Sequence, residues 1–365
     1  MGFNCGIVGL PNVGKSTLFN AILGTAAAAA DNYPFCTIEP NVGRVPVPDR
    51  RLVRVAEVAG SPKVLPTQLE VVDIAGLVRG ASRGEGLGNR FLGAIREVDA
   101  ILHVVRCFEG GDVAHVEGRV DPVRDIELVE TELLLADLGS LERQVEGLTK
   151  RARGGDAEAK VQLALIERIL PELQAGRPAR SLELAPDEQA RLGTLQLLSA
   201  KPVLYVCNVD EASAAQGNQF SAAVAAHAAA EGAGAVVVAA AIEAEVARLG
   251  PDDRREYLHA LGLEQPGLER VIVAGHRLLD LIMFFTAGPK EARAWTIRRG
   301  TRAQDAAGVI HSDFARGFIC AEVAACDEFV RYGGEAGARE AGRLRQEGRD
   351  YPIEDGEVVR FRFNV

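Results

Sequence analysis

The sequence predicts an α/β protein with a mostly parallel sheet and helices on both of its faces, an inserted α-helical hairpin, and a C-terminal α+β module. The sheet is indicated by short, continuous apolar runs at 3–10, 69–77, 99–107, 202–209 and 234–242, because strands that are buried on both faces have this composition. The insertion is indicated by long, charged and helically periodic segments between the third and fourth of these runs.

The bulk composition is that of an ordinary globular chain. Its 365 residues, 47% apolar and 25% charged, suffice for two or three domains. The net charge of −10 opposes non-specific attachment to nucleic acid or to an anionic membrane, although a local basic patch is compatible with it. We expect no membrane segment or signal peptide, since no apolar run is long enough. The six cysteines form no C-x-x-C pair, so we expect reduced thiols in a cytoplasmic protein.

The first strand leads into a phosphate-binding motif. The segment GLPNVGKST at 9–17 matches G-x-x-x-x-G-K-[ST] between a predicted strand and a predicted helix, which is the context that a P-loop requires. Backbone amides of this loop should face the phosphates, the Lys15 ammonium should neutralise the β- and γ-phosphates, and the Ser16 hydroxyl should ligate Mg²⁺. The residues expected to bind nucleotide here are Asn12, Val13, Gly14, Lys15, Ser16 and Thr17.

Two further segments are expected to complete the phosphate and metal site. The second apolar run ends in DIAG, where Asp73 should hold Mg²⁺ through water and the Gly76 amide should contact the γ-phosphate. Thr37, in YPFCTIEPN, lies in a plausible switch loop and could close onto Mg²⁺ when the γ-phosphate is present. The expected metal ligands are therefore Ser16, Thr37 and Asp73.

The residue that would activate the attacking water is not evident. Leu77 follows Gly76 at the position where a Ras-like switch carries Gln, and leucine cannot orient water. Hydrolysis should therefore be slow, or be assisted by another residue, an ion or a partner. His115 and Glu85 are candidates, with the alternative that both are solvated loop residues. His103 lies within an apolar run and is expected to be a core histidine.

The helical insertion begins near Ile126. Two helically periodic segments, 126–152 and 156–174, are joined by RGGD, which predicts an antiparallel hairpin of coiled-coil character or, alternatively, two ordinary surface helices. Beyond Leu278 the pattern indicates strands at 292–297, 318–324 and 357–365 with helices near 303–311 and 326–334. The predicted domains are a nucleotide-binding domain in two segments (1–127 and 201–277), the inserted hairpin (128–200) and the C-terminal domain (278–365).

The segment NVDE at 208–211 ends the fourth apolar run and resembles the Asn-Lys-x-Asp motif that binds guanine. Asn208 can bind either purine, but the carboxylate at the fourth position selects guanine through its N1-H and 2-amino donors. Glu211 is one methylene longer than Asp, which should spoil that bidentate grip and cost about 1–3 kcal/mol of discrimination. Val209 can pack against the base edge. We therefore expect a purine site for ATP rather than GTP, formed by Asn208, Val209 and Glu211.

These motifs, in this order, resemble one family. The segments GLPNVGKST, YPFCTIEPN, DIAGLVRGASRGEGLGN, HVVRCFE and NVDE are similar to those of the YchF family of Obg-like ATPases, within the TRAFAC class of P-loop proteins. The segments FTAGPKEARAWTI, AAGVIHSDFARGF and GRDYPIEDGEVVRFRFNV resemble the TGS domain of the same family, a β-grasp module. The resemblance covers essentially the whole chain.

The resemblance implies more than the residues alone. It implies an α/β P-loop NTPase domain, an α-helical hairpin domain and a C-terminal TGS domain, with Leu77 as the family's hydrophobic replacement of the catalytic Gln. In related P-loop proteins an Asn like Asn12 ligates K⁺, so stimulation by potassium is inferred. It further implies association with the ribosome, as the large subunit or the 70S particle, ribosomal RNA contacts through the helical insert and TGS domain, and a role in translation and stress responses.

The sequence leaves three functions to be distinguished. The first is a Mg²⁺-dependent enzyme that prefers ATP and acts as a slow switch. The second is a binding module in which nucleotide mainly orders a ribosome-binding or RNA-binding surface and hydrolysis is incidental. The third is a conventional GTPase. Lys15, Gly76 and His115 are the residues assigned to catalysis in the first function.

Overall fold

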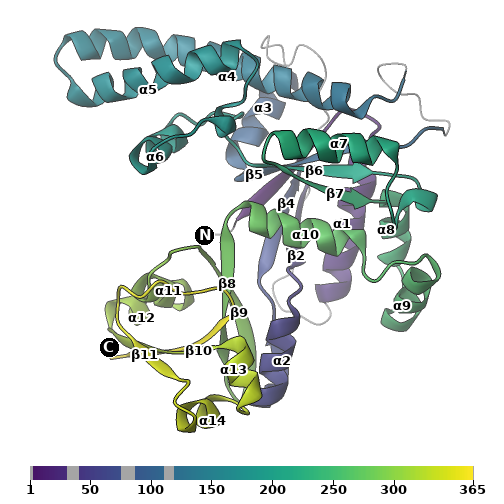
Figure 1. Cartoon of the computed structure of the whole chain (residues 1–365), viewed down its shortest axis with the longest axis vertical. Coiled ribbons are helices and arrows are strands. Elements are labelled where there is room, and N and C mark those ends of the chain that lie inside the picture. The colour runs from purple at the N-terminus through teal and green to yellow at the C-terminus, as the bar shows by residue number, and fades with distance from the viewer. Residues whose placement is uncertain (1–2, 31–40, 75–86, 111–118, 365) are drawn as a thin grey trace. The chain divides into compact units, whose positions relative to one another are not determined.

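The computed structural model describes residues 3–30, 41–74, 87–110 and 119–364 (Figure 1). The chain divides into two units. Within the described residues, the first unit lies in the ranges 3–28, 41–44 and 70–275, and the second in 29–30, 45–69 and 276–364. There are two six-stranded sheets in the described residues, one lying largely in the first unit and the other in the second.

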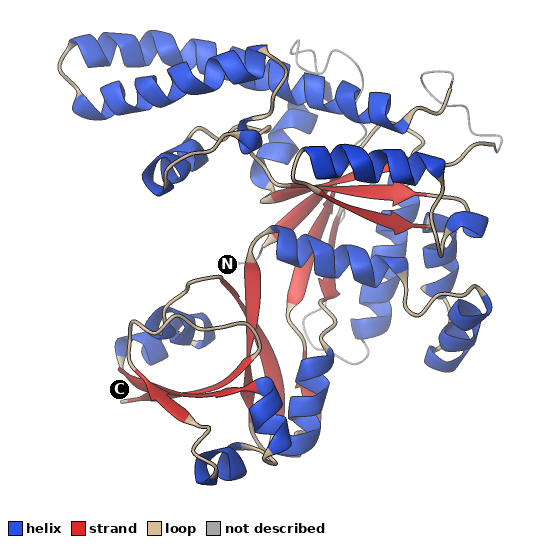
Figure 2. Cartoon of the chain, in the orientation of Figure 1, coloured by secondary structure: helices blue, strands red, loops and turns tan. Residues whose placement is uncertain are grey.

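The sheet of the first unit has the strand order β2-β4-β1-β5-β6-β7, and the pairs β4-β1, β1-β5, β5-β6 and β6-β7 are parallel. Helix α7 covers one face and helix α10 the other (Figures 1 and 2). This confirms the predicted mostly parallel sheet. The strands are β1 (Asn4–Val8), β2 (Val42–Pro46), β4 (Gln68–Asp73), β5 (Ala100–Arg106), β6 (Val203–Asn208) and β7 (Gly234–Val238). The helices outside the insert are α1 (Lys15–Ala30), α3 (Leu87–Glu97), α7 (Gln219–Ala230), α8 (Ala240–Val246), α9 (Pro251–Ala260) and α10 (Gly267–Leu278).

The central strands explain why the sequence contains continuous apolar runs. Every residue of β5 and β6 is buried, as expected for strands covered on both faces. The strand expected over 234–242 is too long, because β7 ends at Val238 and α8 begins at Ala240. Alanine has the highest helix propensity, so an alanine run that follows a strand readily begins a helix.

The inserted hairpin consists of α4 (Pro122–Arg153) and α5 (Ala157–Gln174), followed by the short helices η2 (Ala179–Ser181) and α6 (Pro186–Thr194). Gly155, with φ of 94°, lies in the turn, and the Asp156 carboxylate caps α5 by accepting from the Ala159 amide at 3.1 Å. The hairpin predicted from the two periodic segments and RGGD is confirmed.

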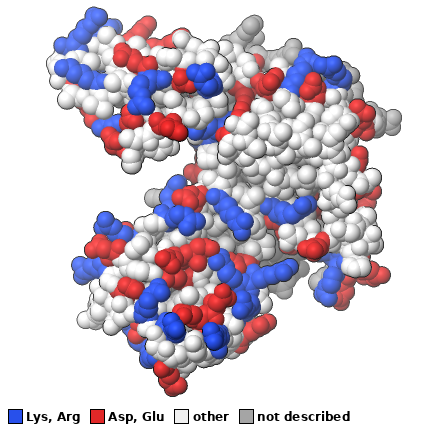
Figure 3. All heavy atoms as spheres, viewed as in Figure 1, with Lys and Arg blue, Asp and Glu red and all other residues white. Residues whose placement is uncertain are grey.

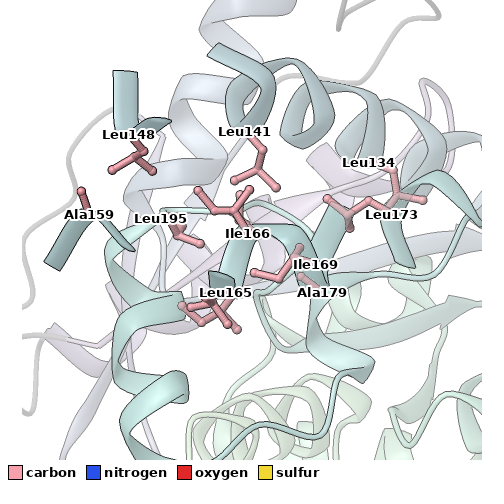
Figure 4. Close-up of a cluster of buried hydrophobic side chains, with 12 residues drawn as sticks. Leu134, Leu141, Leu148, Ala159, Leu165, Ile166, Ile169, Leu173, Ala179 and Leu195 are labelled. Carbon is pink, nitrogen blue, oxygen red and sulfur yellow. The ribbon is translucent and has the colours of Figure 1, made fainter. Parts of the chain in front are cut away.

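The core of the hairpin has coiled-coil spacing (Figure 4). Its buried residues on α4 repeat every seven positions, with partly buried residues between them at steps of four and three. Leu165, Ile166 and Ile169 of α5 pack into the same cluster. Both helices contribute apolar stripes, so the coiled-coil interpretation is favoured over two independent surface helices. The α4 residues in this pattern are Leu134, Leu138, Leu141, Val145, Leu148 and Ala152.

A buried carboxylate attaches the hairpin to the chain that returns to the sheet. Asp137 of α4 accepts from the Leu198 amide at 2.9 Å, from the Ser199 amide at 2.8 Å and from the Ser199 hydroxyl at 2.6 Å. Burial raises the pKa of Asp137, while these three donors oppose that shift. The carboxylate therefore closes the insertion at its base.

The second unit contains a mixed sheet with the order β11-β10-β12-β8-β9-β3. Strands β8 and β9 are antiparallel, β12 is antiparallel to β10, and β12 is parallel to β8. The expected strands and helices of the C-terminal region are confirmed as β9, β10, β12, α11 and α13. The strands are β3 (Lys63–Leu65), β8 (Leu281–Ala287), β9 (Glu291–Arg298), β10 (Phe318–Ala325), β11 (Arg345–Glu347) and β12 (Glu357–Phe363). The helices are α2 (Arg50–Ala59), α11 (Ala303–Ile310), α12 (Ser312–Arg316), α13 (Cys326–Arg331) and α14 (Glu335–Glu340).

Residues 45–69 belong to this second unit, although the sequence analysis placed them in the nucleotide-binding domain. Strand β3 pairs in parallel with β9, and Arg51 of α2 forms an ion pair with Asp355 at 2.8 Å. The Thr67 and Thr296 hydroxyls are 2.5 Å apart. Pairing between strands that lie so far apart in the chain leaves no local signal, so composition could not assign this segment.

Among the helices of the described residues, none combines the length and the apolar character needed to cross a lipid bilayer.

The hairpin core gives a stability prediction. Ile166 is fully buried in the cluster, so Ile166→Ala should destabilise the hairpin by about 2–5 kcal/mol through lost burial and a residual cavity. Val161→Ala, on the same helix at a side chain that is 47% exposed, should change stability by less than about 0.5 kcal/mol. Hydrogen exchange of the α5 amides measures the change in stability in both variants. Equal protection in the two variants would contradict this account of the core.

Candidate nucleotide-binding site

The carboxyl ends of the parallel strands meet at one edge of the first unit's sheet, and a cavity of about 750 Å³ lies there. Crevices at this edge are where open α/β sheets bind ligands. The cavity joins the loop after β1 to the loop after β6. Its lining residues are Asn12, Gly14, Lys15, Ser16, Thr17, Phe108, Asn208, Val209, Asp210, Glu211, Ala212, Ala240 and Ala241.

The loop after β1 has the backbone conformation that its glycines permit. Gly9 and Gly14 have φ of 154° and 95°, and Asn12 is left-handed with φ of 62°. A Cβ at Gly9 would lie 2.4 Å from the Val104 carbonyl oxygen, and a Cβ at Gly14 would lie 2.2 Å from Asn208 Nδ2. Close packing of the loop against β5 and β6 therefore requires glycine at both positions.

Lys15 begins α1 and is folded back over this loop. Its Nζ donates to the Gly9 carbonyl at 3.0 Å and to the Leu10 carbonyl at 2.5 Å. Burial lowers the pKa of Lys15 to about 8, and the nearby Asp73 carboxylate partly opposes that shift. The ammonium is thus held beside the phosphate loop, where a bound anion would raise the pKa of Lys15 again.

Ser16 and Asp73 are the described residues that fit a magnesium ion. Ser16 is exposed in the cavity, and Asp73 ends β4, the strand next to β1. Burial raises the pKa of Asp73, whereas Lys15 lowers it. Hydroxyl and carboxylate oxygens are the donors that Mg²⁺ prefers. Bound Mg²⁺ would neutralise phosphate charge, and these two side chains would hold it.

Several predicted residues lie outside the described part of the chain. They are Thr37, Gly76, Leu77, Glu85 and His115. The expected contacts of Thr37 with Mg²⁺, of the Gly76 amide with the γ-phosphate and of His115 with water therefore stay predictions.

Asn208 connects three segments of the site. Its Nδ2 donates to the Val13 carbonyl at 2.9 Å, and its Oδ1 accepts from the Ala240 amide at 2.9 Å. The side chain is buried, so these bonds are shielded from water. The Asn208 amide therefore holds the phosphate loop and the start of α8, and its expected contact with the purine edge stays a prediction.

The two acidic residues of the NVDE segment, Asp210 and Glu211, have different surroundings. Asp210 caps the short helix η3 (Glu211–Ser213), since its carboxylate accepts from the Ser213 amide at 2.9 Å. Glu211 is exposed and lines the cavity. Val209 is buried, and its amide donates to the Val238 carbonyl at 2.9 Å. Asp210 lines the cavity as well, but the Ser213 amide already binds one of its carboxylate oxygens, which favours Glu211 as the carboxylate for a base.

Phe108 was not among the predicted site residues. It lies two residues after the end of β5 and lines the cavity, and the Arg106 guanidinium lies 4.5 Å from the centre of its ring. The sequence did contain a signal for Phe108. This aromatic residue comes just after a buried parallel strand, beside the strand that carries the base motif. His103 is buried within β5 as expected, and burial lowers its pKa to about 3.

Family comparisons match both ends of the chain. Residues 4–132 match a family described as "50S ribosome-binding GTPase". Residues 281–364 match the family YchF-GTPase_C, described as "Protein of unknown function (DUF933)".

Three relatives that match the chain over its full length share one name. Proteins called "Ribosome-binding ATPase YchF" are 56% identical in Pasteurella multocida, 53% in Escherichia coli O157:H7 and 48% in Bacillus subtilis, each over 100% of both chains. The solved structure titled "Structure of the Schizosaccharomyces pombe YchF GTPase" is 37% identical, with a TM-score of 0.89 over 99% of this chain and 98% of that one. Identity at this level over the whole length shows that the chain belongs to the YchF family.

Proposed function

We propose that this protein is a Mg²⁺-dependent P-loop NTPase that binds ATP in preference to GTP, hydrolyses it slowly to ADP and phosphate, and associates with the ribosome. The observation that carries the proposal is the cavity that the phosphate loop shares with Glu211. The bacterial relatives named as ribosome-binding ATPases support the same activity.

The phosphate half of the site has a clear chemical role. Backbone amides of the loop and the N-terminus of α1 favour an anion, and Lys15 supplies a full positive charge beside them. Ser16 and Asp73, and Thr37 in the proposed closed state, would hold Mg²⁺, which would supply positive charge to neutralise the phosphates. Asn12 is the residue through which a K⁺ ion would add charge.

The base half supports adenine. Glu211 lines the cavity at the position that an Asp occupies in guanine-specific sites, and its extra methylene displaces the carboxylate. Phe108 and Val209 provide apolar walls to the same cavity. The names of the relatives use both ATPase and GTPase, so the base preference calls for a direct measurement.

The proposed slow turnover rests on Leu77, the residue after Gly76. Leu77 has no group that can orient water, so hydrolysis depends on His115, an ion or a partner. The same residue favours a second candidate function, a binding module whose nucleotide orders a ribosome-binding surface. In either case the proposed cellular role is in translation and the stress response.

The hairpin is the proposed ribosome contact within the first unit. Lys150, Arg151 and Arg153 lie in the last turn of α4, at the far end of the hairpin. Figure 3 shows Lys and Arg side chains gathered at this end together with some Asp and Glu. A local basic cluster can contact RNA phosphates even though the net charge of the chain is −10.

Glu211→Asp should restore guanine recognition. We expect the unmodified, nucleotide-free protein to bind ATP more tightly than GTP, and Glu211→Asp to favour GTP by about 1–3 kcal/mol relative to ATP. Titration calorimetry with both nucleotides measures the change. Tighter GTP binding by the unmodified protein would overturn the proposed preference.

Two variants control this experiment. Glu264→Asp makes the same change at an exposed glutamate outside the cavity and should leave both affinities unchanged. Asn208→Ala should weaken ATP and GTP alike, because Asn208 holds the phosphate loop rather than selecting the base.

Nucleotide binding should take up protons in mildly alkaline solution. The pKa of Lys15 is about 8 in the nucleotide-free protein and rises when phosphates bind, so binding above pH 8 must protonate Lys15 and affinity must fall as pH increases. Calorimetry in buffers of different ionisation enthalpy measures the uptake. In Lys15→Arg the guanidinium stays charged at every pH used, so the variant should show no such proton uptake. Equal proton uptake at neutral pH and above pH 8 would contradict this assignment.

Ribosomes should accelerate hydrolysis if the protein is a coupled enzyme. Single-turnover ATP hydrolysis is measured with and without ribosomes, and again with Lys150→Gln/Arg153→Gln, which should reduce the acceleration by weakening phosphate contacts. The control Arg248→Gln/Arg255→Gln removes two exposed charges outside the hairpin and the TGS domain and should retain the acceleration. Absence of hydrolysis under both conditions would instead support the binding module.

A further inference from the structure

A group of metal-ligating side chains lies in the first unit, apart from the nucleotide cavity. Glu130 of α4, His227 of α7 and Glu231, which follows α7, each offer a ligand atom, and these atoms lie within 4.8 Å of one another. None of the three lines the nucleotide cavity. The proposed ATPase activity does not use them.

Neighbouring side chains bind one oxygen of each carboxylate. Arg180 Nη2 donates to Glu130 Oε1 and, at 2.9 Å, to Glu231 Oε2. The Tyr205 hydroxyl contacts the same two oxygens at 2.9 and 3.1 Å. Within the described residues, Glu130 Oε2 and Glu231 Oε1 make no hydrogen bond. Each glutamate is therefore held in place by one oxygen and keeps the other available.

His227 presents the third donor atom. Its Nε2 is buried without a hydrogen-bond partner among the described residues, and it lies 3.5 Å from Glu231 Oε1. The imidazole ring packs edge-on against Tyr205, with ring centres 5.8 Å apart. An unbonded buried nitrogen facing a carboxylate oxygen is costly unless a cation or a proton lies between them.

We propose that Glu130, His227 and Glu231 form a binding site for a transition-metal ion of the Zn²⁺ type. Imidazole and carboxylate donors suit Zn²⁺, and three protein ligands leave one position for water. Arg180 and Tyr205 then serve as outer partners, which orient ligating carboxylates in metal sites.

The charges in the cluster permit a cation. Two carboxylates and one guanidinium give a net charge of −1 when His227 is neutral, so a divalent ion is attracted although Arg180 opposes it. The ion would connect α4, which continues into the hairpin, to α7 beside β6. Binding would therefore hold the base of the hairpin against the sheet.

Cobalt provides a direct probe of this site. Nucleotide-free protein is titrated with Co²⁺ in the absence of Mg²⁺, and the visible absorption of Co²⁺ reports ligand type and number. We expect one equivalent with nitrogen and oxygen ligands and no thiolate charge-transfer band, displaced by Zn²⁺. His227→Phe keeps an aromatic ring beside Tyr205 and should weaken binding by at least about 10- to 100-fold, the loss found for outer partners alone.

Two controls distinguish the site from other ligands. His259→Phe removes an exposed histidine of α9 and should leave the Co²⁺ spectrum unchanged. Glu231→Gln retains the size of the side chain and should weaken binding as His227→Phe does. Circular dichroism and ATP binding establish that each variant is folded.

The proposal fails under any of three results. They are the absence of saturable Co²⁺ binding, a thiolate band that assigns the ion to cysteine, and binding that His227→Phe and Glu231→Gln leave unchanged. ATP affinity is measured separately, so failure of the metal site and failure of the proposed ATPase are distinguishable.

Discussion

The two hydrogen bonds of the Asn208 amide connect the parts of the nucleotide site. Asn208 ends β6, accepts from the first amide of α8 and donates to the phosphate loop after β1. The Gly14 backbone lies so close to Nδ2 that a side chain there would collide with it. Because the Asn208 side chain is buried, loss of its amide would leave two unsatisfied backbone groups and release the loop.

This connection explains why the phosphate and base halves share one cavity. The phosphate loop is held at its carbonyl side by Asn208 and spanned by Lys15, so its amides are left to face an anion. The residues that follow Asn208 turn into η3, which places Glu211 at the cavity while Asp210 caps the helix. One strand end therefore supports both binding of phosphate and contact with the base.

Polar groups also organise the insertion. Asp137 binds the returning chain at the base of the hairpin, whereas the more distant part of the hairpin depends on a coiled-coil seam of apolar side chains. Arg180, after the hairpin, joins Glu130 and Glu231 beside β6. Buried ion pairs add little net stability, but removing one partner is costly because the other charge is left buried and unpaired.

The sequence by itself determined those features of the fold and of the site that depend on short, continuous segments. The phosphate loop, the buried strands and the hairpin each follow from adjacent residues, because glycine spacing, continuous apolar runs and helical periodicity act locally. Tertiary structure alone decided that Asn208 holds the loop and that Phe108 lines the cavity. It also decided that β3 pairs with β9 and that Glu130 meets His227. These contacts join residues far apart in the chain, and no local pattern records which distant groups will satisfy a buried polar atom.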